Sequence, residues 1–128
     1  MPEGLKIVLV EDDAHVRDSL SQSLELAGFA VRAFDSAEAA IGHLPPGFPG
    51  IVISDVRLPG MDGLAFMRRV LESNADVPVI LVTGHGDISM AVRAIREGAY
   101  DFIEKPFPVG RLVDAVVRAE SWQRRRLT

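Results

Sequence analysis

Short runs of consecutive branched apolar residues recur along this sequence, and they restrict its fold more than any other feature. Four such runs lie at residues 5–10, 50–54, 78–82 and 100–103. A run that is apolar on consecutive positions is typical of a strand buried on both faces. A fifth run, at residues 29–34, alternates in polarity, as a strand at the edge of a sheet does.

Helical periodicity occupies the stretches between these runs. Apolar residues three or four positions apart predict helices at residues 16–27, 36–44, 64–71, 88–99 and 112–119. Local signals mark several helix ends: Asp13 and Asp87 as N-caps, Gly28 as a C-terminal stop, and Pro45 with Pro46 as a break. Because strand and helix alternate along the chain, we expect an α/β domain with a parallel sheet covered on both sides.

Length and composition limit the classes of protein that remain. With 128 residues the chain suits one domain, and the absence of cysteine excludes disulfide frameworks and thiolate metal sites. The net charge of −4 argues against a domain built mainly to hold nucleic acid. No apolar run approaches the ~20 residues of a membrane span. We therefore expect a soluble cytoplasmic domain.

The C-terminal end differs in composition from the rest of the chain. Residues 123–126 read Gln-Arg-Arg-Arg and lie beyond the last apolar stripe. Such a stretch is typical of an exposed helix end or of the start of a linker. We therefore expect one domain over residues 1–121, followed by a helix end or the beginning of a linker at residues 122–128.

Polar side chains follow four of the five predicted strands. Glu11 and Asp12 come directly after the first strand, Asp55 after the third, Thr83 after the fourth and Lys105 after the fifth. In a doubly wound sheet, ligands bind outside the carboxyl ends of the strands, where the strand order reverses. We therefore expect these side chains to face one crevice.

The chemistry of this set narrows what the crevice can bind. Two carboxylates ~4 Å apart repel by about 4 kcal/mol at an effective dielectric constant of ~20, so such a cluster requires protonation or a cation. Oxygen ligands without histidine or cysteine favour Mg²⁺, or Mn²⁺, over zinc. Together with a lysine and a hydroxyl group, they form a site for a phosphoryl group.

Asp55 is the best candidate to carry that phosphoryl group, because a carboxylate can act as a nucleophile and form an acyl phosphate. It stands alone after a central strand, whereas Glu11 and Asp12 lie beside each other, as metal ligands do. The chain has no glycine-rich nucleotide-binding motif, and an acidic loop after the first strand would repel a nucleotide's phosphates. We therefore expect another phosphorylated molecule as the donor.

Four motifs, in this order and at this spacing, resemble those of the receiver domain of bacterial two-component response regulators. They lie at residues 9–13, 54–63, 82–86 and 104–107. Other segments resemble more specifically the receivers of sigma-54-dependent activators, such as those that regulate C4-dicarboxylate transport. The resemblance covers nearly the whole chain. It implies a flavodoxin-like doubly wound (βα)5 fold, with a five-stranded parallel sheet in the order 2-1-3-4-5.

The resemblance also implies a role for each residue of the crevice. Asp55 would accept a phosphoryl group from a phosphohistidine on a sensor histidine kinase. Asp12, Asp55 and the backbone carbonyl of Arg57 would bind Mg²⁺ directly, and Glu11 would hold a metal-bound water. Many family members have Asp at the position of Glu11, so the directness of its contact with the metal is in question.

A conformational switch is a further implication of the resemblance. Thr83 and Lys105 would contact the phosphoryl oxygens, and the Lys105–Pro106 peptide bond is expected to be cis. Phe102 occupies the aromatic switch position of the family. Phosphorylation would draw Thr83 toward Asp55 and allow Phe102 to turn inward, which would change the surface of the fourth helix, fifth strand and fifth helix.

In the activators that this chain resembles, that surface controls dimerisation and an output domain that regulates transcription. The resemblance implies a homodimer and, if this chain is a fragment, an AAA+ ATPase domain and a DNA-binding domain elsewhere in the protein. It implies no contact with nucleic acid or membrane by this domain itself. It also implies a signalling domain and not an enzyme, with Mg-dependent self-phosphorylation and autodephosphorylation only.

Three alternatives stay open on the sequence alone. A phosphatase of the haloacid-dehalogenase kind uses similar groups, but it places Asp-x-Asp after its first strand, where this chain has Glu-Asp-Asp. A flavin-binding electron carrier of the same topology would favour hydroxyl groups at that position. A receiver that acts through protein contacts alone would not need the complete acidic set.

Overall fold

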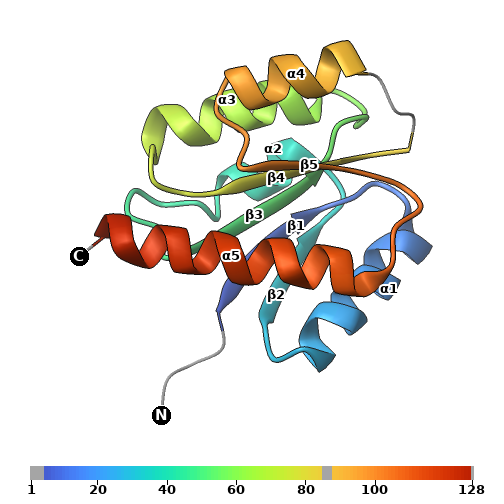
Figure 1. Cartoon of the computed structure of the whole chain (residues 1–128). Coiled ribbons are helices and arrows are strands. Elements are labelled where there is room, and N and C mark those ends of the chain that lie inside the picture. The colour runs from blue at the N-terminus through green and yellow to red at the C-terminus, as the bar shows by residue number, and fades with distance from the viewer. Residues whose placement is uncertain (1–4, 85–87, 128) are drawn as a thin grey trace.

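Parallel strands form one five-stranded sheet in the order β2-β1-β3-β4-β5, and helices cover both of its faces (Figure 1). The computed structural model describes residues 5–84 and 88–127. The elements in chain order are β1 (Lys6–Val10), α1 (Ala14–Leu26), β2 (Ala30–Phe34), α2 (Ala37–Ile41), β3 (Gly50–Asp55), α3 (Gly63–Ser73), β4 (Val79–Thr83), α4 (Ile88–Arg96), β5 (Asp101–Glu104) and α5 (Val109–Leu127).

Each predicted apolar run forms a strand whose ends differ only slightly from the prediction. β3 and β4 are buried along their whole length, and β1 is buried except at Lys6. β2 lies at one edge of the sheet and keeps exposed positions, as its alternating polarity predicts. Asp55 and Thr83 are the last residues of β3 and β4 instead of following them, so both stand at the carboxyl edge of the sheet.

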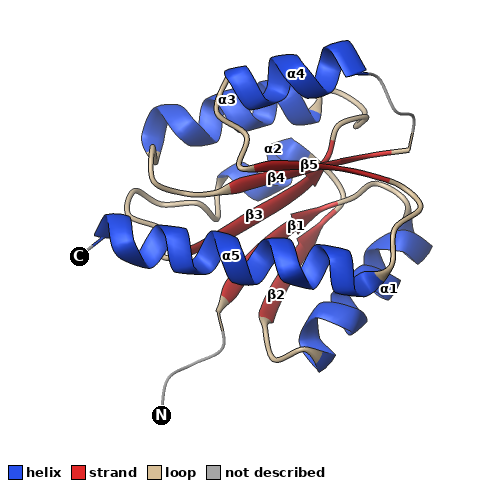
Figure 2. Cartoon of the chain, in the orientation of Figure 1, coloured by secondary structure: helices blue, strands red, loops and turns tan. Residues whose placement is uncertain are grey.

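Alternate side chains of the central strands divide the core into two layers. One layer contains Val8 and Leu81 and packs under α2, α3 and α4, whereas the other contains Ile7 and Ile80 and packs under α1 and α5. Figure 2 shows the helices on the two sides of the sheet. Because both faces are filled by apolar side chains, the carboxyl edge is where polar groups from several strands can meet.

Acidic caps set the starts of two helices next to that edge. Asp13 caps α1 as predicted, and its carboxylate accepts hydrogen bonds from the backbone N–H groups of His15 and Val16. Asp62 caps α3 in the same way, with a hydrogen bond of 2.8 Å from the N–H of Ala65. These caps satisfy backbone donors that the first turn of a helix leaves without partners.

Two helices are shorter than their periodicity predicts. α2 spans Ala37–Ile41 instead of residues 36–44, because Gly42 ends the helix and the next two N–H groups bond to carbonyl oxygens only three residues back. α4 ends before Gly98, whose φ of 116° lies in the left-handed region that favours glycine. The N-cap predicted at Asp87 lies outside the described residues.

The fifth helix extends through the polar stretch near the C-terminus. It runs without a break past residue 121, where the sequence suggests a boundary. Although Gln123 belongs to this polar stretch, it is only 4% exposed. Within the described part of the chain, every helix is too short or too polar to cross a lipid bilayer.

A glycine allows α3 to begin directly against the end of β3. The N–H of Gly63 donates to the carbonyl oxygen of Val56 at 2.8 Å. A Cβ atom on Gly63 would overlap the carbonyl oxygen of Asp55 and lie 2.8 Å from Cα of Val56. Since these are backbone atoms at the end of a buried strand, they cannot move aside without disturbing Asp55 itself.

We therefore expect Gly63→Ala to lower the free energy of unfolding by about 1 to 3 kcal/mol, the usual effect of overpacking. Chemical denaturation followed by circular dichroism measures this change. Gly42→Ala is a matched control, because nothing lies within 4 Å of its Cβ position and its φ is −66°. Equal losses in the two variants would contradict the close-contact explanation.

Candidate functional site

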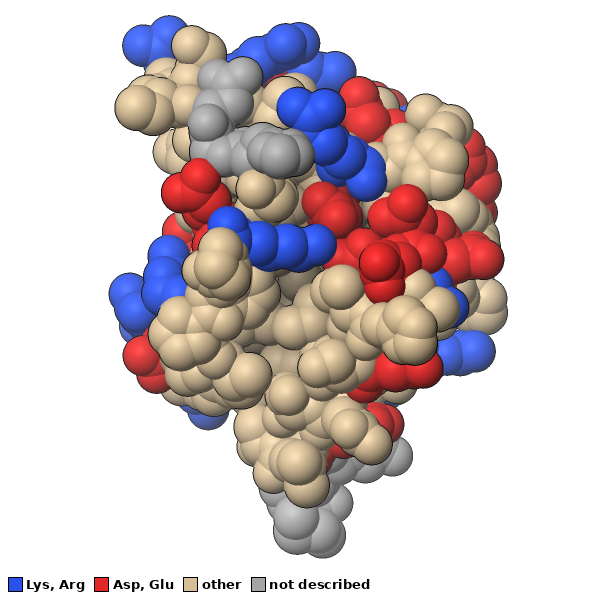
Figure 3. Space-filling model, turned by 90° about the vertical axis from the view of Figure 1, so that its right-hand side faces the viewer, with Lys and Arg blue, Asp and Glu red and all other residues tan. Residues whose placement is uncertain are grey.

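Carboxylates from two neighbouring strands meet at the carboxyl edge of the sheet. Glu11 and Asp12 follow β1, Asp55 ends β3, and one oxygen atom of each lies within 4.8 Å of the others. The two strands are paired so that Val10 lies opposite Ser54, which sets Glu11 beside Asp55. Figure 3 looks onto this side of the molecule and shows acidic side chains gathered beside a basic one.

Lys105 places a positive charge among these carboxylates. Its Nζ donates to Oε1 of Glu11 at 2.7 Å and to Oδ2 of Asp55 at 3.1 Å. The side chains of Glu11 and Asp55 are only 3% and 10% exposed, so water screens these ion pairs less than it screens surface pairs. The backbone holds the lysine in place, because its N–H donates to the carbonyl oxygen of Thr83 at 2.7 Å. The peptide bond from Lys105 to Pro106 is cis.

Burial and ion pairing act in opposite directions on the titration of this cluster. Burial raises the pKa of Glu11, although the hydrogen bond from Lys105 partly offsets that effect. Burial by itself lowers the pKa of Lys105, but the hydrogen bonds to Glu11 and Asp55 outweigh it, and the pKa is raised overall. The lysine therefore stays charged at neutral pH, while the charge on Glu11 is incompletely compensated.

The donor set of this cluster fits a hard divalent cation. Three carboxylates and one ammonium group leave two negative charges when all four groups are ionised. Carboxylate oxygens are the ligands that Mg²⁺ prefers, and the cluster contains neither histidine nor cysteine. Glu11, Asp12 and Asp55 therefore fit a Mg²⁺ ion, whose charge would balance the two that Lys105 leaves.

Hydrogen bonds to the backbone hold the acidic loop after β1. Nη1 of Arg17, in α1, donates to the carbonyl oxygen of Glu11 at 2.9 Å, and the N–H of Asp13 donates to Oε2 of Glu11 at 3.1 Å. Just after β3, the N–H of Arg57 donates to Oδ1 of Asp55 at 3.3 Å. The sequence analysis did not single out Arg17. The sequence indicates this contact only weakly, through a basic residue in the first turns of a helix that comes directly after an acidic loop.

Another contact that the sequence analysis missed fixes the loop between β3 and α3. Oε2 of Glu38, in α2, accepts a hydrogen bond of 2.9 Å from the N–H of Met61, and this bond lowers the pKa of Glu38. Gly60, in the same loop, has a φ of 74°, and a Cβ there would lie 2.6 Å from the Glu38 carboxylate. No local pattern connects Glu38 with a loop 23 residues further along the chain.

Thr83 and Phe102 lie on the two strands that follow β3 across the sheet. Thr83 is 1% exposed and comes directly after Val82, which pairs with Asp55. Phe102 pairs with Leu81 on the neighbouring strand and is partly buried against the core layer under α2, α3 and α4. The sheet thus places both expected switch residues on adjacent strands, on the β5 side of β3.

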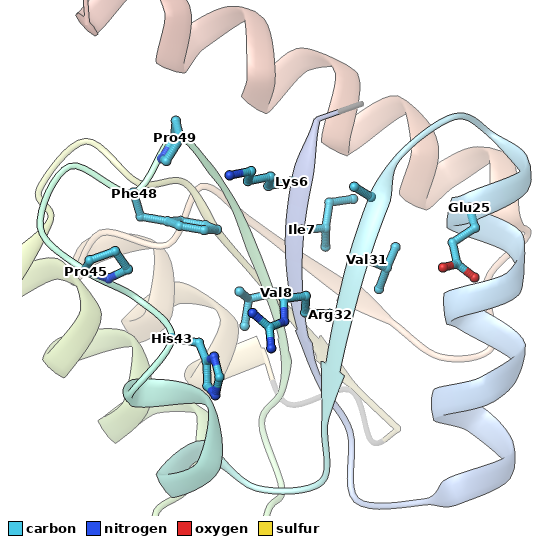
Figure 4. Close-up of a pocket in the computed structure, with 11 residues that line it drawn as sticks. Lys6, Ile7, Val8, Glu25, Val31, Arg32, His43, Pro45, Phe48 and Pro49 are labelled. Carbon is cyan, nitrogen blue, oxygen red and sulfur yellow. The ribbon is translucent and has the colours of Figure 1, made fainter. Parts of the chain in front are cut away.

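A separate hollow of about 570 Å³ lies near the beginning of β1 and β2 (Figure 4). Lys6, Arg32 and Phe48 are among its lining residues, and none of the clustered carboxylates is. β1 begins at Lys6 and leads to the acidic loop only after Val10, so the hollow and the acidic cluster lie at opposite ends of this strand.

Comparison with known proteins identifies the family. A family model described as response regulator receiver domain matches residues 7–117. The chain belongs to this family. The family expected from the sequence motifs is therefore confirmed, as is the flavodoxin-like fold with strand order 2-1-3-4-5. Membership of the receiver family argues against the phosphatase and the flavin carrier as alternatives.

Relatives of this chain include proteins that are named as transcriptional regulatory proteins. The chain is 56% identical over 127 residues to the C4-dicarboxylate transport transcriptional regulatory protein DctD of Rhizobium meliloti (strain 1021). That match covers 99% of this receiver and 27% of DctD, so the chain spans about a quarter of that relative's length. It is 44% identical over 113 residues to the transcriptional regulatory protein FixJ of Bradyrhizobium diazoefficiens, covering 88% of this chain and 55% of FixJ.

Solved structures of other receivers have the same fold. The crystal structure of FixJ-N superposes with a TM-score of 0.83 and 39% identity, covering 94% of this receiver and 96% of that chain. The structure of NtrX from Brucella abortus in complex with ADP superposes with a TM-score of 0.89 and 35% identity. This second match covers 96% of the receiver and 28% of NtrX.

The charge of the acidic cluster predicts that Mg²⁺ stabilises the receiver. At a free Mg²⁺ concentration of about 100 times its Kd, the free energy of unfolding should rise by about 2.7 kcal/mol. Chemical denaturation with and without Mg²⁺ measures this gain. Asp12→Asn should remove most of it, because one of the clustered carboxylates is lost.

Glu72→Gln provides the control for that substitution. It also replaces a carboxylate by an amide, but Glu72 is an exposed residue near the end of α3, outside the acidic cluster. The Mg²⁺ response of this variant should equal that of the original receiver. If both substitutions reduce the stabilisation by Mg²⁺ equally, the ion binds outside the acidic cluster.

Proposed function

We propose that this receiver accepts a phosphoryl group on Asp55 from a phosphohistidine of a sensor histidine kinase, in a Mg-dependent reaction. The observation that supports this most strongly is the ion-paired cluster in which Nζ of Lys105 lies 3.1 Å from Oδ2 of Asp55. A carboxylate at the end of a central strand, in a buried residue and beside an ammonium group, has the chemistry of a phosphoryl acceptor.

The transfer is a displacement at phosphorus. A carboxylate oxygen of Asp55 forms a new P–O bond, and the P–N bond to the kinase imidazole breaks. The bonding electrons leave with the imidazole nitrogen, which takes up a proton. The product on this chain is an acyl phosphate, so no nucleotide has to enter the acidic crevice.

The residues around Asp55 have distinct roles in this proposal. Lys105 is already held beside Asp55 and offsets the charge of the phosphoryl oxygens, and Thr83 contributes a hydroxyl group from the end of β4. Asp12, Asp55 and the backbone carbonyl of Arg57 hold Mg²⁺, with Glu11 acting through a metal-bound water. When bound, the ion supplies positive charge that lowers the repulsion between the carboxylates and the incoming phosphoryl group.

Phosphorylation then changes a surface on the far side of β4. Thr83 moves toward the acyl phosphate, Phe102 turns inward, and the surface of α4, β5 and α5 adopts a second arrangement. Exposed apolar side chains on α4 and α5 support this part of the proposal. They include Ile88 at 84%, Val92 at 46%, Ile95 at 48% and Val117 at 51% exposure, which suits a surface that pairs with a second copy.

The output in this proposal is regulation of transcription. DctD is named a transcriptional regulatory protein, and the match with this chain covers 27% of its length. We infer that the receiver controls a homodimer and, in a longer protein, an AAA+ ATPase and a DNA-binding domain. Its own chemistry is limited to self-phosphorylation and autodephosphorylation, in the cytoplasm and without direct contact with nucleic acid or membrane.

Asp55→Asn should abolish labelling by acetyl phosphate in the presence of Mg²⁺, because the amide cannot form an acyl phosphate. Intact-protein mass spectrometry measures the labelled fraction, and circular dichroism checks that the fold is kept. Asp18→Asn, at an exposed position of α1, should be labelled like the original chain. Undiminished labelling of Asp55→Asn would show that another residue is the acceptor.

Lys105→Ala should weaken the conformational response to acetyl phosphate about tenfold, the usual order for losing a charge-assisted hydrogen bond. NMR chemical shifts of α4, β5 and α5 report that response, and a Mg²⁺ titration reports metal binding, which should change by less than about threefold. Lys6→Ala is the matched control, since Lys6 is the only other lysine and starts β1 at the opposite edge. Equal losses of response and metal binding would contradict the role of Lys105.

A further inference from the structure

A buried amide lies in the polar stretch near the end of α5. Gln123 is 4% exposed, although three arginines follow it directly. Its Nε2 donates to the carbonyl oxygen of Gly50 at 2.9 Å, with the carbonyl oxygens of Asp76 and Phe48 at 3.4 and 3.5 Å. A single side chain thus faces three backbone acceptors from two different loops.

These acceptors lie at the base of the sheet, opposite the acidic edge. Gly50 begins β3, Phe48 precedes it, and Asp76 lies in the connection that leads into β4. Gly50 is tightly enclosed: a Cβ there would lie 2.7 Å from the ring of Phe48. An amide is well suited to this place, because its two N–H donors can serve more than one of these carbonyl oxygens. Removing such a donor from a buried site leaves the acceptors desolvated and unsatisfied.

Additional contacts hold the same turns of α5. Nε of Arg126 donates to Oδ1 of Asp76 at 3.0 Å, and the guanidinium group lies 4.7 Å from the centre of the Trp122 ring. Trp122 in turn contacts the ring of Tyr100, just before β5, with 5.9 Å between ring centres. Arg126 and Asp76 are both partly exposed, so their ion pair is weak by itself. The buried amide is therefore the main contact.

We propose that Gln123 is an anchor that fixes the last two turns of α5 to the base of the sheet, at the beginning of the acceptor strand. These turns then belong to the receiver itself, although the family match ends at residue 117. β3 carries Gly50 at its first residue and Asp55 at its last, so the anchor and the acceptor share one strand. A further consequence rests on the proposed function. If α5 leads to an output domain, the anchor sets the direction in which α5 points toward that domain.

Backbone hydrogen exchange of the unphosphorylated receiver tests the anchor without depending on phosphoryl transfer. Gln123→Met keeps the length and most of the volume of the side chain but removes the donor. Exchange of the amides at residues 119–126 should become about tenfold faster, the change expected from losing one buried hydrogen bond. Exchange in the first two turns of α5 and in β1 should stay within about twofold of the original chain.

Arg124→Met is the matched control, because it changes the next residue, whose side chain is 70% exposed and forms an ion pair with Glu120 on the same helix. It should leave exchange of residues 119–126 within about twofold of the original. Unchanged exchange in Gln123→Met would overturn the proposal, because it would show that the amide does not restrain these turns. Faster exchange throughout the chain would also overturn it, because it would show a general loss of packing.

A second variant keeps the proposal testable if Gln123→Met does not fold. Gln123→Asn keeps the amide but shortens the side chain by one methylene group, so its donor no longer reaches the carbonyl oxygen of Gly50, and exchange of residues 119–126 should again become faster. Unchanged exchange of these amides in Gln123→Asn would then overturn the proposal. Labelling by acetyl phosphate should be normal in every folded variant, so loss of labelling in the original chain would count against the proposed function and not against the anchor.

Discussion

The site of this receiver depends on holding three carboxylates around one ammonium group. Parallel strands make this possible, because each brings its last residue to the same edge, so that Glu11 and Asp55 arrive side by side and Lys105 reaches both. Without the lysine, like charges about 4 Å apart would repel by about 4 kcal/mol per pair at a dielectric constant of ~20. With it, the cluster remains short of positive charge. That deficit is the reason why the three carboxylates fit a divalent cation.

Much of this arrangement follows from local sequence. Runs buried on both faces specify central strands, alternating polarity places β2 at an edge, and a polar residue after each run identifies the carboxyl edge where Asp55, Thr83 and Lys105 meet. These features are predictable because each depends on a few neighbouring residues and on the rule that parallel strands share one carboxyl edge. The order of the strands was not derivable from the runs, and it came from the resemblance to a known family.

The contacts that sequence could not supply are those between distant segments. Glu38 fixes the loop at Met61, and Gln123 reaches the carbonyl oxygen of Gly50, 73 residues away. A glutamate on a short helix and a glutamine before three arginines are ordinary surface residues by composition. What makes them structural is the distant backbone group that each one bonds to, and only the folded chain shows where such groups lie. The predicted α2 is too long for a similar reason. The apolar periodicity of the sequence continues to residue 44, but the backbone hydrogen bonds are no longer α-helical after Ile41.

The two ends of α5 are attached to different parts of the sheet. Near its beginning, Arg111 pairs with Asp101 at the start of β5, with 3.1 Å between Nη1 and Oδ2, whereas near its end Gln123 is bound to the start of β3. β5 carries Phe102 and belongs to the surface expected to switch, while β3 is buried along its whole length and carries Asp55, the proposed acceptor. A rearrangement of β5 would therefore reach α5 through its first turns. Because Gln123 binds the last turns to the start of β3, we expect such a change to rotate or bend α5 instead of translating it.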